Sequence, residues 1–347
     1  MSVQADRSET RFRVVLVNPE PRDPEGVARP IREAGGWLET AVCSRPDEVI
    51  AAAQGARGLI IRALREQADR VFESLPDLAV VGRMGIGVDS LDVAAATRHG
   101  VCVVNVPSFC EEEVADHAMA LLLACARRLV PDAGAVRAGE WPEANRTPLR
   151  RLRGQTLGLA GFGKIARLVA ARGRAFGLRV KAHDPHAPAA AFAAAGAEPV
   201  SFPDLLAQSD FISIHCPLLP ETRGLFGASA LARMKPTAFL INTARGAIVD
   251  EEALVSALQD GRLAGAGLDV SAQEPPPADH PLRRLENVVL TPHTAWYSEE
   301  AVAELDAKIG RYMAQAILGE RPESLVNPEA WGKRAGLKPG PHRPTGG

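Results

Sequence analysis

Three short segments near the C-terminal end of the chain carry side chains that suit hydride chemistry on a carbonyl group. They are Asn242-Thr243-Ala244-Arg245-Gly246, Leu268-Asp269-Val270 followed by Glu274-Pro275, and Thr291-Pro292-His293. Reduction of a 2-oxo acid needs a cation for the carboxylate, a donor that protonates the new alkoxide, and a hydride source. The segments supply an Arg, a Glu and a His in this order, so an enzyme is the first hypothesis.

Arg245 and His293 each follow an apolar stretch that is typical of a buried strand. Ligands bind at the C-terminal edges of strands in open α/β sheets, and the planar guanidinium of Arg245 could hold a carboxylate through two hydrogen bonds. Histidine titrates near neutral pH, so His293 could both donate and accept a proton. Glu274 could hydrogen-bond the imidazole, favour its protonated form and fix its orientation.

Taken singly, each of these residues is more simply a solvated loop or surface side chain, and only their combination favours a site. Among the other histidines, His215 alone has a comparable setting, at the end of an apolar strand. We interpret His215 as a side chain that lines the cofactor pocket or bonds within the core, not as a catalytic residue.

A glycine-rich turn directly after an apolar strand is typical of a dinucleotide site. The segment Leu157–Ala166 contains the pattern GxGxxA. Gly161 permits the tight turn, Gly163 lets the backbone approach a pyrophosphate, and the small Ala166 allows close packing of helix on strand. Asp184 ends the next strand, roughly 20 residues after the first glycine, where a carboxylate can bind a ribose diol. The order of strand, glycines, helix and acid favours a cofactor site over a simple strand-ending turn.

The carboxylate of Asp184 also predicts which dinucleotide is preferred. It would repel a 2′-phosphate, and no Arg directly follows it in the sequence. NAD is therefore expected over NADP, although Lys181 or His186 could weaken that discrimination.

Apolar runs that alternate with helical stretches must position these residues. In the first part of the chain, strands are predicted at Val14–Val17, Gly58–Ile61, Leu78–Val81 and Val101–Val104. In the second part they are predicted at Thr156–Ala160, Arg179–His183, Phe211–His215, Ala238–Ile241, Gly265–Val270 and Val288–Leu290. Continuous apolar strands separated by helices imply parallel sheets covered on both faces. A long helix is expected from Glu111, and another over Ser298–Leu318 that could return to the first domain.

Composition limits the class of protein. A chain of 347 residues suggests two domains, and 46% hydrophobic with 24% charged residues is typical of globular proteins. The net charge of -2 gives no field that would attract nucleic acid or an anionic membrane. The sequence has no run of about 18 apolar residues, so no transmembrane helix is expected.

The N-terminal segment and the cysteines indicate a cytoplasmic protein. The start, Met1–Arg13, lacks the apolar stretch of a signal peptide. The five cysteines are scattered and odd in number, so neither a disulfide framework nor a metal site is expected. We therefore predict a cytoplasmic protein with reduced thiols.

Together the motifs resemble the D-isomer-specific 2-hydroxyacid dehydrogenase family. The resemblance is carried by Gly161-Phe162-Gly163 with Asp184-Pro185, His215-Cys216-Pro217-Leu218, Asn242 to Gly246, Leu268 to Val270 with Glu274-Pro275, and Thr291-Pro292-His293. It runs from roughly Val14 to Asn327, and the motifs recur in the family's order. Ala166 departs from the commoner third glycine, but a small residue suffices at that position.

The resemblance implies an α/β fold of two Rossmann-like domains with parallel sheets, and an active site in the cleft between the domains. Residues 1–109 and 298–326 would form a discontinuous, flavodoxin-like substrate-binding domain, and residues 110–297 an NAD-binding Rossmann domain. Residues 327–347 are expected to be a flexible tail. A homodimer, built largely from the nucleotide-binding domain, is also implied.

The resemblance further assigns roles to individual residues. His293 would be the acid/base, Glu274 its partner and Arg245 the anchor of the substrate. The cofactor would be held by Gly161, Gly163, Lys164, Ile165, Asp184, His215, Cys216, Pro217, Thr222, Thr243, Ala244, Arg245, Asp269 and His293, with Asp269 near the nicotinamide. The substrate would be bound by Arg83, Ile86, Gly87, Arg245 and Trp296, with the amides of Ile86 and Gly87 facing its carboxylate.

The run from His293 to Glu299 is similar to the C-terminal-binding-protein branch of the family, whose animal members serve as NAD-sensing transcriptional corepressors. Arg83 also matches a substrate-contacting Arg of that branch. Trp296 would place an aromatic wall beside the active site and favour a substrate with an apolar side chain. Packing in the core or at a dimer interface explains Trp296 equally well.

The expected function is that of an NAD-dependent dehydrogenase that interconverts a 2-oxo acid and a D-2-hydroxy acid. Glyoxylate, hydroxypyruvate or a larger apolar 2-oxo acid are the expected substrates. The alternative is an NAD(H)-sensing regulatory dimer with little or no turnover. A third option is a relative that acts on an inorganic anion or on formate. Glu274 and Trp296 argue against formate, because formate needs no alkoxide proton. Neither a nucleic acid nor a membrane is expected as a partner.

Overall fold

The computed structural model describes residues 12–19, 24–143 and 148–333. The chain divides into two compact units. The first unit contains Met1–Phe109 and Glu299–Gly347, and the second unit contains Cys110–Ser298. Each unit is built on its own parallel sheet, so the prediction of an α/β fold with two parallel sheets is confirmed.

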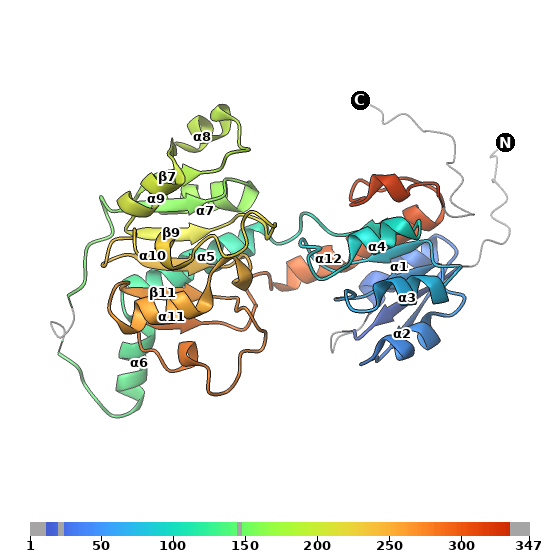
Figure 1. The fold of residues 1–347 in the computed structure, drawn as a ribbon, viewed down its shortest axis with the longest axis horizontal. Helices are drawn as coiled ribbons and strands as arrows, with labels where there is room; N and C mark the ends of the chain where they lie inside the picture. The colour runs from blue at the N-terminus through green and yellow to red at the C-terminus, as the bar shows by residue number, and fades with distance from the viewer. Residues whose placement is uncertain (1–11, 20–23, 144–147, 334–347) are drawn as a thin grey trace. The chain divides into compact units, whose positions relative to one another are not determined.

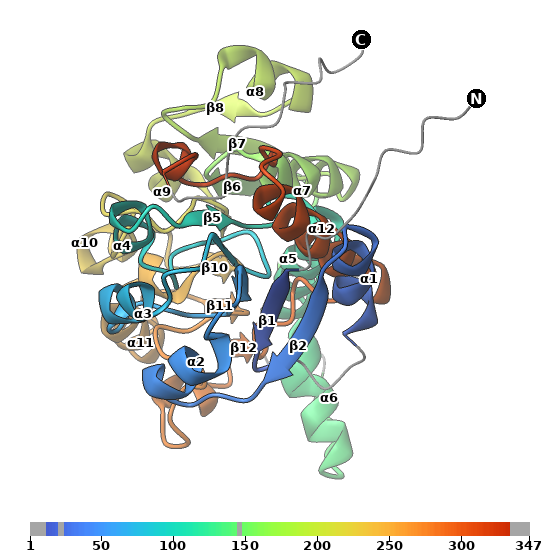
Figure 2. The ribbon, with the colours of Figure 1, turned by 90° about the vertical axis from the view of Figure 1, so that its right-hand side faces the viewer.

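The sheet of the first unit has the strand order β2-β1-β3-β4-β5, which is the order of flavodoxin-like, doubly wound sheets. Its strands are β1 (Arg13–Val17), β2 (Trp37–Ala41), β3 (Gly58–Ile60), β4 (Val80–Gly82) and β5 (Cys102–Val104). β1 and β2 lie side by side in parallel register (Figure 2). Helices α2 (Pro46–Ala53), α3 (Ala68–Ser74) and α4 (Val93–Arg98) bury one face of the sheet.

The opposite face is covered by α1 (Glu25–Glu33) and α12 (Glu299–Ile317), which pack against each other. Glycines make this close packing possible. A Cβ at Gly82 would lie 2.6 Å from the sulfur of Met313, so the sheet has room for α12 only where it lacks a side chain. The last long helix of the chain therefore completes the core of the unit that the chain began.

The chain after α12 remains packed against the first unit at residues that the sequence assigns to a flexible tail. Asn327 is 2% exposed. Its side-chain nitrogen Nδ2 donates to the carbonyl of Val101 and to the hydroxyl of Thr97, and its side-chain oxygen Oδ1 accepts from the backbone amide of Val103 at 2.7 Å. The short 3₁₀ turn Pro328–Ala330 follows. The expectation of a tail that is loose from residue 327 is thus wrong for residues 327–333, and residues 334–347 lie outside the described residues.

The sheet of the second unit has the order β12-β11-β10-β9-β6-β7-β8. Its strands are β6 (Thr156–Ala160), β7 (Arg179–His183), β8 (Glu198–Pro199), β9 (Phe211–Ile214), β10 (Phe239–Asn242), β11 (Gly265–Leu268) and β12 (Val288–Leu290). All neighbours run parallel, so their C-terminal ends meet at one edge, where ligands bind in such sheets.

Helices cover both faces of this sheet (Figure 1). One face packs against α5 (Glu111–Ala126), α7 (Lys164–Ala175) and α8 (Ala189–Ala195). The other face packs against α9 (Phe202–Gln208), α10 (Ala228–Leu231) and α11 (Glu251–Gln259). α6 (Leu129–Arg137) follows α5 and projects from the body of its own unit (Figure 1). Two 3₁₀ turns, Gly246–Ile248 and Pro281–Arg283, lie in the loops after β10 and before β12.

Most strand predictions agree with the observed strands to within two residues, and the bounds of β6, β7 and β12 agree fully. The edge strands β2 and β8 were not predicted from the sequence. These two edge strands bury few or no side chains, as the burial of Trp37–Ala41 and of Glu198–Pro199 shows, so they lack the apolar run that marks a buried strand.

The described residues add three further observations. No described helix is long and apolar enough to cross a bilayer. All five cysteines are free thiols. Among the described residues, no group of three or more His, Cys, Asp or Glu side chains could hold a metal ion.

Candidate active site

The three segments that first pointed to chemistry follow three neighbouring strands of the second unit. Asn242–Gly246 follows β10, Asp269 follows β11, and Thr291–His293 follows β12. Since these strands are adjacent and parallel, the segments converge at one edge of the sheet. A cavity of about 550 Å³ opens there, and its lining includes Asp269, Glu274 and His293.

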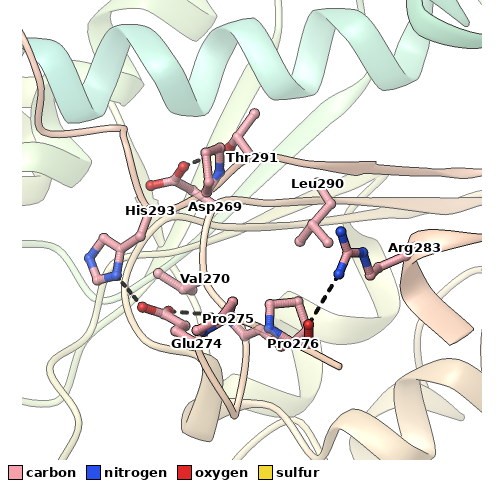
Figure 3. A pocket seen from close by; sticks show the side chains of 11 residues that line it. Asp269, Val270, Glu274, Pro275, Pro276, Arg283, Leu290, Thr291 and His293 are labelled. Atoms are coloured by element: carbon pink, nitrogen blue, oxygen red, sulfur yellow. Dashed lines mark hydrogen bonds and ion pairs between the residues drawn. The ribbon is translucent and has the colours of Figure 1, made fainter. Parts of the chain in front are cut away.

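Glu274 and His293 form a hydrogen-bonded pair at this cavity (Figure 3). The Nδ1 atom of His293 lies 2.6 Å from Oε2 of Glu274. Burial would raise the pKa of Glu274, but the hydrogen bond and charge of His293, the Ser271 amide and the charge of Arg245 outweigh it and lower that pKa below its ordinary value. An ionised carboxylate only accepts, so Nδ1 carries a proton. The other ring nitrogen, Nε2, is then the atom that can exchange a proton with a ligand.

A second carboxylate, that of Glu251, fixes the loop that carries Glu274. The amide of Ser271 donates to Oε1 of Glu274 at 3.2 Å. The hydroxyl of Ser271 donates to Glu251 at 2.7 Å, and the amide of Ala272 donates to the same oxygen at 3.0 Å. His280 lies 3.0 Å from the other oxygen of Glu251. Glu274 is therefore oriented from both sides, by His293 and by a loop anchored to α11.

Asp269 holds the loop that carries His293. Its side chain is 1% exposed. It accepts from the hydroxyl of Thr291 at 2.6 Å and from the amides of Thr294 and Ala295 at 2.9 Å each, while its own carbonyl accepts from the His293 amide at 2.8 Å. His293 has φ +56°, a left-handed conformation that costs an L-residue about 1–2 kcal/mol. The bonds to Asp269 offset this cost. The resemblance places Asp269 near a nicotinamide; its observed hydrogen bonds are to the His293 loop.

The turn after β10 brings Arg245 to the same edge. The Asn242 side chain donates to the carbonyl of Arg245 at 2.9 Å and accepts from the Ala244 amide at 3.0 Å. The guanidinium of Arg245 donates to the carbonyl of Ala244 at 2.8 Å. Its charge contributes to the lowered pKa of Glu274. Arg245, Glu274 and His293 are thus gathered in one region of the second unit.

The glycine-rich turn lies between β6 and α7, with β9 as its neighbour. Gly161 has φ +90°, and a Cβ there would lie 2.6 Å from the backbone nitrogen of Cys216. A Cβ at Gly163 would meet no atom within 4 Å. The turn therefore needs Gly161 for its own packing, whereas the space beside Gly163 is open to a phosphate at the N-terminus of α7. These residues fit a dinucleotide.

Asp184 serves both the turn and the strand end. Its Oδ2 accepts from the amide of Phe162 at 2.7 Å, and its Oδ1 accepts from the amide of His186 at 2.9 Å. Each carboxylate oxygen can accept more than one hydrogen bond, so the pair can still bind a ribose diol. Lys164 and Ile165 open α7 directly beside this turn.

The polar side chains of the segment after β9 form hydrogen bonds within that segment and its strand. Burial lowers the pKa of His215 to about 4, and its Nε2 lies 2.8 Å from the hydroxyl of Ser213. The hydroxyl of Thr222 donates to the carbonyl of Pro217 at 2.6 Å. Burial raises the pKa of the Cys216 thiol to about 11. A neutral His215 suits the wall of a pocket or the core rather than proton transfer. Thr243 lies buried in the neighbouring β10 turn.

The remaining predicted substrate residues are divided between the units. Arg83, Ile86 and Gly87 belong to the first unit, where the side chain of Asn105 donates to the Ile86 carbonyl at 2.6 Å and so shapes their loop. Trp296 belongs to the second unit, and its indole N–H donates to the carbonyl of His293 at 3.0 Å. Trp296 is therefore part of the loop that carries His293.

Three residues of this site were not predicted from the sequence: Glu251, Ser271 and His117, whose Nε2 lies 2.9 Å from the hydroxyl oxygen of Thr291. Glu251 lies at the start of a helix and Ser271 lies in a loop. Polar residues are common at both kinds of position, so the sequence offers no signal for them. His117 does offer one. It stands one turn from Val114 and Leu121 on the buried stripe of α5, and a histidine on such a stripe needs a polar partner.

Substitution of the two glycines of the turn should have opposite effects on NADH binding and on stability. Gly163→Ala should leave stability unchanged, since φ is −73° and the space is open, but should weaken NADH binding at least about tenfold, or 1.4 kcal/mol. Gly161→Ala should destabilise the protein by about 2 kcal/mol or more, because of positive φ and a backbone clash. NADH fluorescence titration and urea unfolding measure both effects. Unchanged NADH affinity in Gly163→Ala would rule out the turn as the pyrophosphate site.

Similar proteins place the second unit in a known family of domains. Residues 119–295 match the model of the D-isomer specific 2-hydroxyacid dehydrogenase, NAD binding domain. The chain is 40% identical to a D-3-phosphoglycerate dehydrogenase of Mycobacterium leprae over 84% of its own length, but spans only 56% of that relative. It is 43% identical to a glyoxylate reductase of Korarchaeum cryptofilum over 75% of this chain and 79% of that one.

The fold has matching solved structures as well. The TT0316 protein of Thermus thermophilus superposes with a TM-score of 0.81 at 36% identity, over 91% of this chain and all of that one. The sequence motifs and these similarities identify the same family. The chain belongs to the D-isomer-specific 2-hydroxyacid dehydrogenase family, and its second unit contains the family's NAD-binding domain.

Proposed function

We propose that the protein is an NAD-dependent oxidoreductase that interconverts a 2-oxo acid and a D-2-hydroxy acid. The observation that carries the proposal is the His293–Glu274 pair, whose atoms lie 2.6 Å apart in the family's NAD-binding domain and within the electrostatic reach of Arg245. A proton donor beside a cation is what reduction of a carbonyl next to a carboxylate requires.

The cofactor would be held by the turn at Gly161 and Gly163, by the first amides of α7 and by Asp184. Bound nicotinamide supplies or accepts the hydride. The carboxylate of Asp184 favours a free ribose diol over a 2′-phosphate, which supports NAD as the preferred dinucleotide.

His293 is the proposed acid and base. Glu274 fixes the proton on Nδ1 and stabilises the ring when Nε2 is also protonated, so Nε2 donates a proton to the alkoxide in reduction and accepts it in oxidation. Arg245 anchors the substrate carboxylate with its planar guanidinium. Arg83, Ile86 and Gly87 are proposed as a second contact to that carboxylate, and Trp296 as a wall beside the substrate side chain.

The proposed substrates are small 2-oxo acids such as glyoxylate and hydroxypyruvate, or larger apolar ones. The glyoxylate reductase of K. cryptofilum and a glycerate dehydrogenase of Methylorubrum extorquens, 38% identical over 81% of this chain, support the smaller acids. Trp296 supports an apolar side chain, because an aromatic wall gains free energy by covering apolar surface.

We also propose a cytoplasmic location. Burial raises the pKa of the Cys102 thiol to about 11 and that of Cys125 to about 12. Free, unreactive thiols suit a reducing compartment.

The direct test is to follow NADH oxidation with a panel of 2-oxo acids, with NADPH as the comparison cofactor. We expect turnover with at least one acid and a preference for NADH. His293→Ala should lower kcat at least about a hundredfold, because it removes the acid. Tight NADH binding without turnover on any acid would contradict the proposal and favour the regulatory alternative.

Glu274→Gln tests the role of the carboxylate. Glutamine can still accept from Nδ1, but it carries no charge to favour the protonated ring, so the alkaline limb of the reduction rate should move about 1 pH unit or more towards acid. Because the pKa of Glu274 lies below its ordinary value of 4.5, this carboxylate stays ionised at every pH above 4.5. Protonation of Glu274 therefore does not change the rate along the alkaline limb. A pH profile that overlays the wild type would refute this role.

We propose that the protein forms a homodimer through α6 and the segment after it. α6 buries no side chain within its own unit. The exposed apolar residues of this region are Leu129, Val130, Val136 and Trp141, of which Trp141 is 88% exposed. A second copy of the chain is the proposed partner, because soluble oligomers are mostly symmetric homodimers and apolar patches of this kind mark interfaces.

The dimer is tested by sedimentation velocity. Trp141→Glu should shift the protein from dimer to monomer, because it places a charge in the proposed apolar contact. The matched control is Val42→Glu, which changes a valine that is 85% exposed in the first unit and should leave the dimer intact. A monomeric wild type, or a Trp141→Glu variant that remains dimeric, would contradict the proposal.

A further inference from the structure

His117 lies on α5, outside the motifs that identify the site, yet it contacts the loop that carries His293. Its Nε2 lies 2.9 Å from the hydroxyl oxygen of Thr291 and 3.5 Å from Oδ1 of Asp269. Its side chain is 24% exposed. The histidine therefore joins the central helix of the second unit to the end of β12.

The hydrogen-bond partners around Thr291 determine which atom donates and which accepts. Both oxygens of Asp269 already accept backbone amides, so the carboxylate acts as an acceptor. Thr291 has a single hydroxyl proton, and Asp269 at 2.6 Å is its nearest acceptor, whereas the carbonyl of Leu268 lies 3.5 Å away. With that proton directed to Asp269, the oxygen of Thr291 must accept from His117. Nε2 of His117 consequently carries a hydrogen.

The hydrogen bonds that start at His117 lead through Thr291 to the carboxylate of Asp269, which also accepts from the amides of Thr294 and Ala295, directly after the proposed catalytic histidine. Thr291 and His293 flank Pro292, and Asp269 contacts the loop on both sides of it. A left-handed His293 can relax only if these contacts loosen. A misplacement of about 1 Å in a proton donor can lower a rate substantially. The restraint from His117 on Thr291 and Asp269 therefore bears on the alignment of His293.

We propose that His117 is a positioning residue that aligns His293 for proton transfer, by donating from Nε2 to Thr291 and through it to Asp269. The proposal rests on the proposed function of His293. It predicts that the alignment of His293 requires an N–H donor to Thr291 at position 117, and requires neither a charge nor an aromatic ring there. Glutamine places an N–H donor near the position of Nε2, so His117→Gln should retain the function that His117→Ala loses.

The kinetic experiment compares three variants of the full-length protein. His117→Ala should lower kcat about tenfold while the KM values for NADH and the 2-oxo acid change less than about threefold. His117→Gln should recover kcat to within about threefold of the wild type. The matched control is His99→Ala, which removes a histidine that is 21% exposed and lies 3.0 Å from Asp69 in the first unit; it should leave kcat unchanged. Equal losses in the Ala and Gln variants, or an unchanged His117→Ala, would overturn the proposal.

A second measurement does not depend on turnover. Hydrogen exchange followed by NMR should show faster exchange of the Thr294 and Ala295 amides, which bond to Asp269, in His117→Ala but not in His117→Gln or His99→Ala. The ring signals of His293, assigned by their loss in His293→Ala, should shift in the same variant alone. If no 2-oxo acid is turned over, the proposed function fails while these signals still decide the role of His117. Exchange rates and ring signals that match the wild type would overturn it.

Discussion

The carboxylate of Asp269 connects β11 to the loop after β12, and the candidate site depends on that connection. A buried carboxylate is stable only when its oxygens are bonded, and here a hydroxyl and two backbone amides supply those bonds. The same bonds hold His293 in a left-handed conformation that few residues adopt without support. The buried carboxylate of Asp269 thus determines the position of the His293 imidazole.

Three carboxylates in this unit have different tasks because their surroundings differ. Asp269 is buried and binds backbone. Glu274 is half-buried at the cavity, and its pKa is lowered chiefly by the bond to His293, against the effect of burial. Glu251 at the start of α11 binds the loop at Ser271 and Ala272 and so orients Glu274 from behind. Asp269 restrains the backbone of the loop that carries His293, and Glu274 restrains the imidazole ring. Such preorganisation is what proton transfer requires.

The parallel sheet explains how residues far apart in the sequence meet. The segments that carry Arg245, Asp269 and His293 follow β10, β11 and β12, which are neighbours in the sheet. The glycine-rich turn follows β6, whose neighbour is β9, and Gly161 lies against the chain after β9 because a Cβ there would clash with the backbone of Cys216. The proton-transfer residues and the dinucleotide turn thus share one edge, with β9 and β10 between them.

The sequence by itself predicted the central strands and the dinucleotide turn, because apolar runs and glycine patterns are local signals. It also indicated Arg245, Glu274 and His293 as candidate site residues, because the three lie in separate segments whose combination suits hydride chemistry. It did not determine the packing of Asn327, the exposed edge strands β2 and β8, or the roles of His117, Glu251 and Ser271. Those roles depend on which donor faces which acceptor across residues that are far apart in the chain, 20 positions for Ser271 and Glu251 and 174 positions for His117 and Thr291. Only the tertiary structure decides this, since a hydrogen bond requires two atoms within about 3 Å and spacing along the chain does not encode that distance.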